Sequence, residues 1–243
     1  MEVNTLFHVA LLSFGYQVYM AGARVFDKET DKYGGFEHCV NIVTIGNRKY
    51  MVDVGFGPNG PISPLLLEHD RPQRHIPTDT AAMVRLVYEP LPQAMDQSQK
   101  VWVYQQRISP EAEWVPWFCF VDIEFLPEDI NVLNYYTWRS PTSWFTQKVI
   151  VSRFTTNLER DSEEELNQKW GWKSQYKTVD EGMIDGQLTI FHDSLKWRRD
   201  GKVTLDVKLE SEEQRIRAIW KYFGIDLEEE DRLTILGTVG DIK

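Results

Sequence analysis

The sequence contains little cysteine, no long apolar run and no excess of positive charge. Its two cysteines, Cys39 and Cys119, are too few for a disulfide framework. Without a signal peptide, the default location is the reducing cytoplasm. No apolar run approaches the ~18–20 residues of a membrane span, so we expect no membrane partner. The formal net charge of −10 leaves too few Lys and Arg to neutralise a phosphate backbone, so we expect no nucleic-acid partner.

The composition is that of a globular protein rich in aromatic rings. Hydrophobic residues make up 42% of the 243 positions and charged residues 26%, which excludes a disordered or fibrous chain. This length accommodates one large domain or two modest ones. Nine tryptophans and an aromatic content of 13% predict a core or pocket lined by rings. The spacing of Cys and His fits no zinc pattern, so we expect no metal site.

Residues 4–14 have the pattern of a helix that is apolar around nearly its whole circumference. This pattern predicts burial on all sides, and Gly15 follows as a C-terminal stop. The chain opens inside this element, with no preceding turn and no partner helices. We therefore expect that upstream sequence is missing and that this is the last helix of an incomplete helical domain. The apolar positions are Leu6, Phe7, Val9, Ala10, Leu11, Leu12 and Phe14.

The following stretch is typical of a series of short antiparallel strands. Alternating apolar residues indicate the strands, and the polar, glycine-bearing residues 27–35 indicate a loop between the first two. Such a series favours a small barrel or sandwich. Strands are predicted over residues 17–26, 38–45, 48–55, 84–88, 100–107 and 117–125.

The last part of the chain mixes helices and strands. Residues 126–145 read as a helix plus a connection, and residues 158–170 as a loop or short helix with a solvated acidic run. Residues 211–214 form a capping box that opens a helix, which Gly224 ends. Further strands are predicted over residues 147–155, 187–191 and 202–209.

Two strands joined by a Gly-Asn loop at residues 46–47 permit a geometric deduction. Counting outward from a two-residue loop, Val40 faces Asp53, and His38 lies diagonally across from Asp53 on the same face. A carboxylate beside an imidazole fixes its tautomer and stabilises the imidazolium, so this pair is a candidate catalytic dyad. The alternative is a buried hydrogen bond with a structural role only. The apolar setting of Asp53 favours catalysis, because an unpaired carboxylate there would be costly.

A His–Asp dyad of this kind activates a nucleophile, and neither cysteine of the chain fits the role of that nucleophile. Cys39 directly follows His38, so the strand period sends its side chain to the opposite face. It reads as a small buried hydrophobe. Cys119 is flanked by aromatic residues and reads as a core residue. The dyad therefore has no suitable thiol within this chain.

These residues resemble the arylamine N-acetyltransferase family along nearly the whole chain. In that family an Arg-Gly-Gly-x-Cys-x-Glu-x-Asn segment opens a buried helix and carries the nucleophile. Residues 1–4, Met-Glu-Val-Asn, look like the end of this segment, which places the family cysteine immediately before Met1. His38 matches the triad histidine, and Asp53 in Val-Asp-Val-Gly-Phe-Gly matches the triad aspartate. Residues 140–145, Ser-Pro-Thr-Ser-Trp-Phe, resemble a further family segment.

The resemblance implies a ping-pong transfer of an acyl group from acyl-CoA to an arylamine, arylhydroxylamine or hydrazine. His38 and Asp53 would be catalytic, and Phe56 would line the acceptor pocket. Gly35 and Gly57 would let coenzyme A or substrate approach the backbone. Acetyl-CoA or another acyl-CoA would be a co-substrate, and no cofactor would be bound permanently. The residues leave the choice between acetyl and malonyl open.

The missing cysteine leaves two explanations and three functions open. A truncated gene model is favoured over a short protein that cannot perform the family chemistry, because His38 and Asp53 persist. As written, the chain is expected to form no acyl-thioester at the family position. The alternatives to a transferase are a catalytically dead relative that binds coenzyme A or aromatic ligands, or modulates a paralogue, and a distant hydrolase of the papain or transglutaminase type.

The expected fold class is α+β. The resemblance implies a remnant N-terminal helix in residues 1–16 and an antiparallel β-barrel holding the His–Asp pair in residues 17–123. A connecting segment would follow in residues 124–146, and an α/β lid in residues 147–243.

Overall fold

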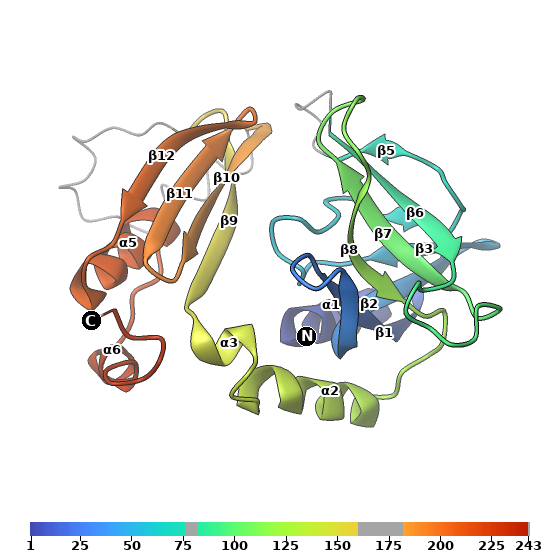
Figure 1. Ribbon diagram of the computed structural model, residues 1–243, viewed down its shortest axis with the longest axis horizontal. Helices are drawn as coiled ribbons and strands as arrows, with labels where there is room; N and C mark the ends of the chain where they lie inside the picture. The colour runs from blue at the N-terminus through green and yellow to red at the C-terminus, as the bar shows by residue number, and fades with distance from the viewer. Residues whose placement is uncertain (76–81, 160–181, 243) are drawn as a thin grey trace. The chain divides into compact units, whose positions relative to one another are not determined.

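The computed structural model describes residues 1–75, 82–159 and 182–242 of the chain. They form two compact units, one within residues 1–138 and the other within residues 139–242 (Figure 1). Each unit combines an antiparallel sheet with helices, which confirms the expected α+β class. No helix in the described ranges is both long and apolar enough to cross a membrane. The four-part division of the chain stays a prediction.

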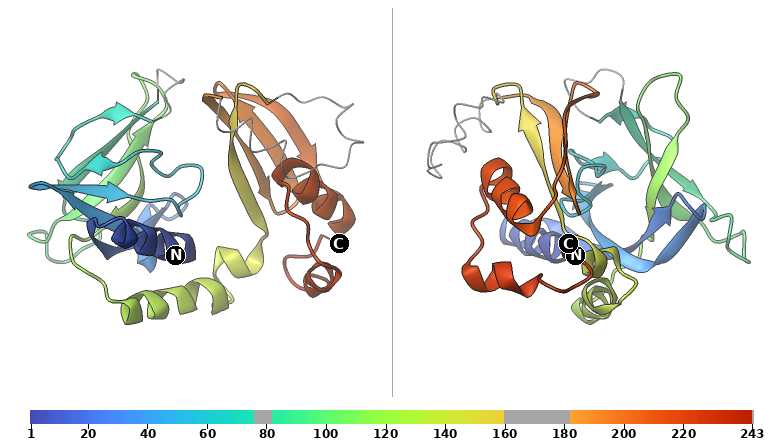
Figure 2. Two further views of the ribbon diagram at one scale, coloured as in Figure 1. Left: turned by 180° about the vertical axis from the view of Figure 1, so that it is seen from behind. Right: turned by 60° about the vertical axis from the view of Figure 1, so that its left-hand side comes forward.

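The first unit is built on an eight-stranded antiparallel sheet that curls into a half-barrel (Figure 2). The strand order is β4-β3-β2-β1-β8-β7-β6-β5, so two-residue strands form both edges. The strands are β1 (Gln17–Asp27), β2 (Lys32–Ile45), β3 (Arg48–Val52), β4 (Leu65–Leu66), β5 (Gln73–Arg74), β6 (Met83–Glu89), β7 (Val101–Arg107) and β8 (Val115–Phe120).

One cluster of buried side chains, the barrel core, draws on strands from both halves of this sheet. Its members alternate along each strand, as expected when one face of a strand is buried. The barrel core consists of Ala21, Ala23, Val40, Ile42, Met51, Leu65, Val84, Leu86, Tyr104, Phe118 and Phe120.

The β2–β3 hairpin has the register that the two-residue loop predicts. Ile45 faces Arg48, and the ladder continues to the pair of Asn41 and Val52. The expected opposition of Val40 and Asp53 does not form, because β3 ends one residue earlier. Asp53 instead begins a turn, in which its side chain accepts backbone N–H bonds.

Helix α1 (Glu2–Ser13) packs against β1 and β2 along one side. Asn4 is its only buried residue, whereas the side chains of Leu6 and Phe14 are 71% and 78% exposed. The prediction that this helix is buried all round is therefore wrong: among the described residues, no layer covers its outer side. The helix ends as predicted at Gly15, which has a φ of +84°.

Helix α2 (Pro127–Arg139) packs beside α1 on the β1–β2 region, and Nδ2 of Asn134 on α2 lies 3.2 Å from Oε1 of Glu2 on α1. Its buried residue, Ile130, packs with Met20 and Cys39 in a small cluster distinct from the barrel core. The strand predicted over residues 117–125 is shorter than expected. It ends at Phe120, and Phe125 returns to form an isolated bridge with Met20.

The second unit is a four-stranded antiparallel meander, in the order β12-β11-β10-β9, with α5 against it (Figure 1). Ser211 caps α5 by accepting the Gln214 N–H, and Gly224 ends it in the left-handed conformation, as predicted. The elements are α3 (Trp144–Gln147), β9 (Ile150–Thr156), β10 (Ile184–Phe191), β11 (Ser194–Arg199), β12 (Lys202–Lys208), α5 (Glu212–Phe223) and α6 (Glu229–Thr234).

Other parts of the secondary structure also differ from expectation, among them β4, β5 and α6, which were not predicted. The loop predicted over residues 27–35 is too long, because β2 already begins at Lys32 and carries the two glycines that suggested a loop. Strand β11 was not predicted, because its basic run resembles a solvated segment. In the sheet it alternates those cations with the buried Leu195 and Trp197. Most of the segment 158–170 lies outside the described residues.

Gly186 on β10 offers a test of the second sheet. A Cβ at this position would overlap the carbonyl oxygen of Arg198 on β11, and a backbone atom cannot move aside without parting the strands. We expect Gly186→Ala to lower the free energy of unfolding by about 1–3 kcal/mol, measured by urea titration. Gly35→Ala on β2 is the matched control, because a Cβ there meets open space. Equal stability of the two variants would contradict this packing.

Candidate catalytic site

His38 on β2 and Asp53 after β3 form a buried ion-pair contact. Nε2 of His38 lies 2.7 Å from Oδ2 of Asp53, and the two residues are only 5% and 6% exposed. An ionised Asp53 accepts the Nε2–H, which leaves Nδ1 as the ring nitrogen able to take a proton. No described residue forms a hydrogen bond with Nδ1. The sequence-predicted pair is therefore brought together in the orientation that a general base needs.

Asn4 in the first turn of α1 is the second partner of Asp53. Its amide nitrogen donates to Oδ1 of Asp53 at 2.8 Å and to the Cys39 carbonyl at 2.7 Å. Its amide oxygen accepts the Val54 N–H at 2.9 Å. Asn4 is fully buried, so these bonds satisfy a side chain that would otherwise be costly there. They fasten the start of α1 to the carboxylate and to both neighbouring chain segments.

The carboxylate of Asp53 is held in its charged form. Oδ1 also accepts the backbone N–H groups of Gly55 and Phe56, at 2.8 and 3.1 Å. Burial alone would raise the pKa of Asp53, but the attraction of His38 and the hydrogen bonds from Asn4 and Gly55 outweigh it. The pKa of this carboxyl therefore lies below its ordinary value.

Two aromatic side chains contact the imidazole and a third continues the row, and together they form what we call the aromatic wall: Phe56, Phe118 and Trp117. The rings of Phe56 and Phe118 meet the His38 ring edge-on, with centroids 5.2 and 5.5 Å away. Phe56 also contacts Phe118 at 4.8 Å and Trp117 at 6.3 Å. Phe56, predicted to be a substrate-binding residue, thus lies directly against the imidazole.

The two glycines predicted to accommodate coenzyme A have different surroundings. Gly57 follows the aromatic residue of the wall with a φ of +83°, a conformation that favours glycine, and its carbonyl accepts the Gly60 N–H. Gly35 is exposed on β2, and nothing within 4 Å would meet a side chain there. The turn conformation explains Gly57, whereas the described residues impose no need for glycine at position 35.

Neither cysteine lies in the site. Cys39 packs with Met20 and Ile130, on the opposite face of β2 from His38, as the strand period predicts. Burial raises the pKa of its thiol to about 11 and that of Cys119 to about 12. Both sulfurs are therefore protonated and unreactive at neutral pH, as small core residues.

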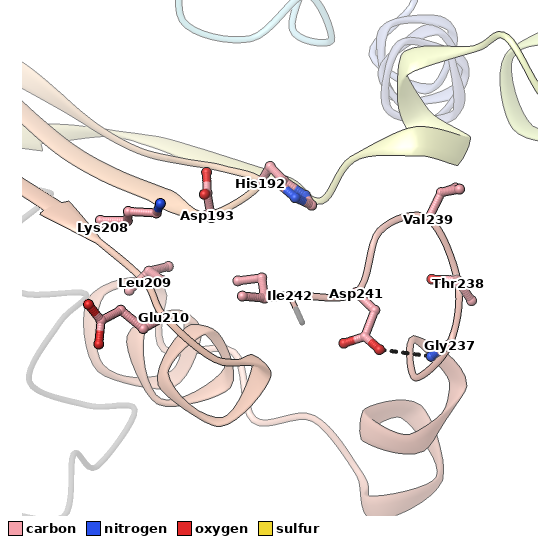
Figure 3. A pocket seen from close by; sticks show the side chains of 10 residues that line it. All are labelled: His192, Asp193, Lys208, Leu209, Glu210, Gly237, Thr238, Val239, Asp241 and Ile242. Atoms are coloured by element: carbon pink, nitrogen blue, oxygen red, sulfur yellow. Dashed lines mark hydrogen bonds between the residues drawn. The ribbon is translucent and has the colours of Figure 1, made fainter.

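A separate cavity of about 720 Å³ lies in the second unit (Figure 3). Its walls are mostly polar, and it contains none of the residues predicted from the sequence. The carboxylate of Asp241 reaches into it while accepting the Gly237 N–H at 2.8 Å. The lining residues are His192, Asp193, Lys208, Leu209, Glu210, Gly237, Thr238, Val239, Asp241 and Ile242.

Sequence reasoning missed two features of the site. One is the role of Asn4 in positioning Asp53, and the other is most of the aromatic wall. Asn4 entered only as the last residue of a family segment, although an Asn inside an apolar helix already signals a buried hydrogen-bonding role. Trp117 and Phe118 entered only as neighbours of Cys119. Phe118 contacts His38 directly and Trp117 contacts it through Phe56, and both contacts depend on strand β8 pairing beside β1, a long-range arrangement without a local signal.

The chain is similar to known proteins over most of its length. A family model described as N-acetyltransferase matches residues 1–163. An N-malonyltransferase of Gibberella moniliformis is 28% identical over 246 residues, covering 96% of this chain and 65% of the relative. This chain thus spans about 65% of the length of that relative.

Two solved structures show the same fold. The arylamine N-acetyltransferase of Mycobacterium abscessus superimposes with a TM-score of 0.73 at 19% identity, covering 98% of this chain and 70% of that chain. The Mycobacterium marinum arylamine N-acetyltransferase in complex with CoA gives a TM-score of 0.64 at 21% identity, with the same coverage.

Asp53→Asn tests the buried charge by its pH dependence. The folded pKa of Asp53 is depressed, so its contribution to stability is complete above the unfolded value of about 3.9 and is lost as the pH falls through the folded value. We expect the variant to be less stable by about 2 kcal/mol at pH 6, and the difference to shrink below about pH 4. Urea titrations across this range measure it.

Asp206→Asn is the control for this experiment. Asp206 is a half-exposed carboxylate paired with Lys196 at 3.1 Å, so its removal should change stability by no more than about 0.5 kcal/mol at any pH. A difference between the Asp53→Asn variant and the native chain that stays constant down to pH 3 would show that no depressed carboxyl is involved.

Proposed function

This chain belongs to the arylamine N-acetyltransferase family, and from that membership we propose that its site transfers an acyl group from acyl-CoA to an aromatic amine or hydrazine. The observation that carries the proposal is the buried contact of His38 and Asp53, which leaves Nδ1 of the imidazole unbonded beside the aromatic wall. Membership in an acyltransferase family is given by the match of residues 1–163. The mechanism and the acceptor are our proposal.

The start of α1 is the position at which a thiol would complete the site. Asn4 holds the first turn of this helix on Asp53, and Asp53 holds His38. From these two contacts we infer that a residue at the helix N-terminus would come close to the imidazole. A thiol at a helix N-terminus beside an imidazolium has a depressed pKa and is a thiolate at neutral pH. In the family pattern, the cysteine falls immediately before Met1.

The proposed reaction has two symmetrical halves. The thiolate attacks the thioester carbonyl of acyl-CoA, the enzyme thioester forms, and the sulfur of coenzyme A leaves with the proton of the His38 imidazolium. The amine then attacks the enzyme thioester, and His38 takes its proton as the amide forms and the thiolate leaves. Asp53 stays ionised throughout and fixes the tautomer of His38.

Substrate binding would use the residues around the imidazole. The Phe56 ring offers an edge and a face to an aromatic acceptor, which favours an arylamine over an aliphatic amine. We propose that Gly57 and Gly35 lie where coenzyme A or substrate approaches the backbone. Relatives named for acetyl and for malonyl transfer both support an acyl-CoA donor, and they leave its acyl group open.

A second candidate function is favoured by the state of the two cysteines. Cys39 and Cys119 are buried, and their raised pKa values keep them protonated. Without another thiol, the residues around the imidazole would bind acyl-CoA or an aromatic ligand and catalyse nothing. This alternative, in which the site only binds its ligands, predicts binding of acyl-CoA without covalent labelling.

Intact-mass spectrometry after incubation with acetyl-CoA or malonyl-CoA tests the proposal. We expect the 243-residue chain to gain no acyl group. A variant with Arg-Gly-Gly-Met-Cys added before Met1 should gain one acetyl or malonyl group, because the added thiol stands at the start of α1. An aromatic amine should then remove the label.

Two controls make this outcome specific. The same extension with Ser in place of Cys should gain no label. His38→Gln in the extended chain should slow labelling by roughly 100-fold or more, because general-base catalysis contributes about that much. Labelling of the unextended chain at Cys39 or Cys119 would overturn the proposed site. An extended chain that binds acyl-CoA without labelling would support the binding-only alternative.

A further inference from the structure

Lys28 places a positive charge on the aromatic wall. It lies in the turn between β1 and β2, and its Nζ is 3.6 Å from the ring centroid of Trp117. Trp117 contacts Phe56, and Phe56 contacts His38, so the ammonium is two ring contacts from the imidazole. A cation over an indole face is a favourable contact. This contact fixes the position of the Lys28 side chain, which is otherwise exposed.

The ammonium of Lys28 has no anionic partner among the described residues. The neighbouring carboxylate of Asp27 is occupied in the turn, where it accepts the Glu29 N–H at 2.9 Å and the Thr30 hydroxyl at 2.8 Å. Partial burial lowers the pKa of Lys28, which means that its charge has lost some hydration without a compensating anion. An anion beside the Lys28 ammonium would compensate for this lost hydration.

Trp117 provides a second donor without an acceptor. Its indole N–H is buried, and no described residue accepts a hydrogen bond from it. A buried donor without an acceptor is costly, and native structures rarely leave one. The ammonium and the indole N–H therefore give one end of the aromatic wall two free donors, whereas the other end carries the imidazole.

We propose that Lys28 and Trp117 form an anion-recognition position that selects substrates bearing a carboxylate. The inference rests on the proposed function, because the selected molecule is a substrate of the His38 site. The carboxylate can belong to the acyl donor, as in a malonyl group, or to the aromatic acceptor. Both sources present the same chemistry: two anionic oxygens for an ammonium and an N–H.

Isothermal titration calorimetry of the 243-residue chain with two ligand pairs distinguishes the sources. The donor pair is malonyl-CoA and acetyl-CoA, which differ by one carboxylate. The acceptor pair is 4-aminobenzoate and 4-aminobenzamide. We expect the carboxylate-bearing member of one pair to bind more tightly than its neutral partner. Lys28→Met should weaken the binding of that member by roughly 3- to 10-fold, the range for a partly exposed charged hydrogen bond. The neutral member should be unaffected.

Three variants distinguish recognition of an anion at this position from an effect of overall charge. Lys32→Met removes a positive charge from the same hairpin, where the side chain is exposed and stacks on no ring of the described residues. It should leave the affinity ratio within each ligand pair unchanged. Lys28→Arg keeps the charge and should retain most of the preference. Trp117→Phe removes the indole N–H and should reduce the preference in the same pair as Lys28→Met.

The outcomes separate this inference from the proposed function. If the neutral ligands bind and Lys28→Met changes no ratio, the proposed function stands and anion recognition is wrong. If no acyl-CoA and no aromatic amine binds, both fail. If Lys32→Met has the same effect as Lys28→Met, the preference reflects overall charge, which also overturns the position assigned here.

Discussion

The buried carboxylate of Asp53 is the constraint on which the rest of the first unit depends. A carboxylate removed from water is stable only with charge compensation and several donors. Here it receives four hydrogen bonds, from His38, Asn4 and the N–H groups of Gly55 and Phe56. These donors come from β2, from α1 and from the turn after β3. Satisfying one charge therefore fixes the relative positions of three segments distant in sequence.

The same constraint explains why parts of the site could be predicted from the sequence and others could not. The two-residue loop and the register of the β2–β3 hairpin, both local rules, bring His38 and Asp53 near each other, but Asp53 makes the contact from the turn after β3 and not from the predicted strand position. Trp117 comes from β8, whose place beside β1 no local pattern encodes. Helix α1 shows the opposite failure. Its apolar residues suggest burial on all sides, but a pattern cannot tell whether the chain supplies covering layers, and Leu6 is 71% exposed.

The two kinds of position available to a thiol in this fold differ in their electrostatics. On a strand, alternation separates Cys39 from His38 and buries its sulfur among apolar groups, which raises the pKa to about 11. At the start of α1, where we propose that a thiol would complete the site, the helix dipole and the imidazole would both favour the thiolate. The difference between the two positions is thus a difference between an inert core thiol and a nucleophile. Proximity to His38 in sequence is therefore a poor guide to reactivity in this fold.

The aromatic wall separates charges that could not otherwise share a small apolar site. The rings of Phe56 and Phe118 exclude water from the face of His38, which strengthens its attraction to Asp53. The same rings would make a second buried charge costly, so a further ionic group has to stand at the edge of the wall, where water still reaches it. Lys28 occupies such an edge, over Trp117. An amine directed to the imidazole and a carboxylate directed to the ammonium then require a flat, apolar spacer between them, and an aromatic ring has that shape.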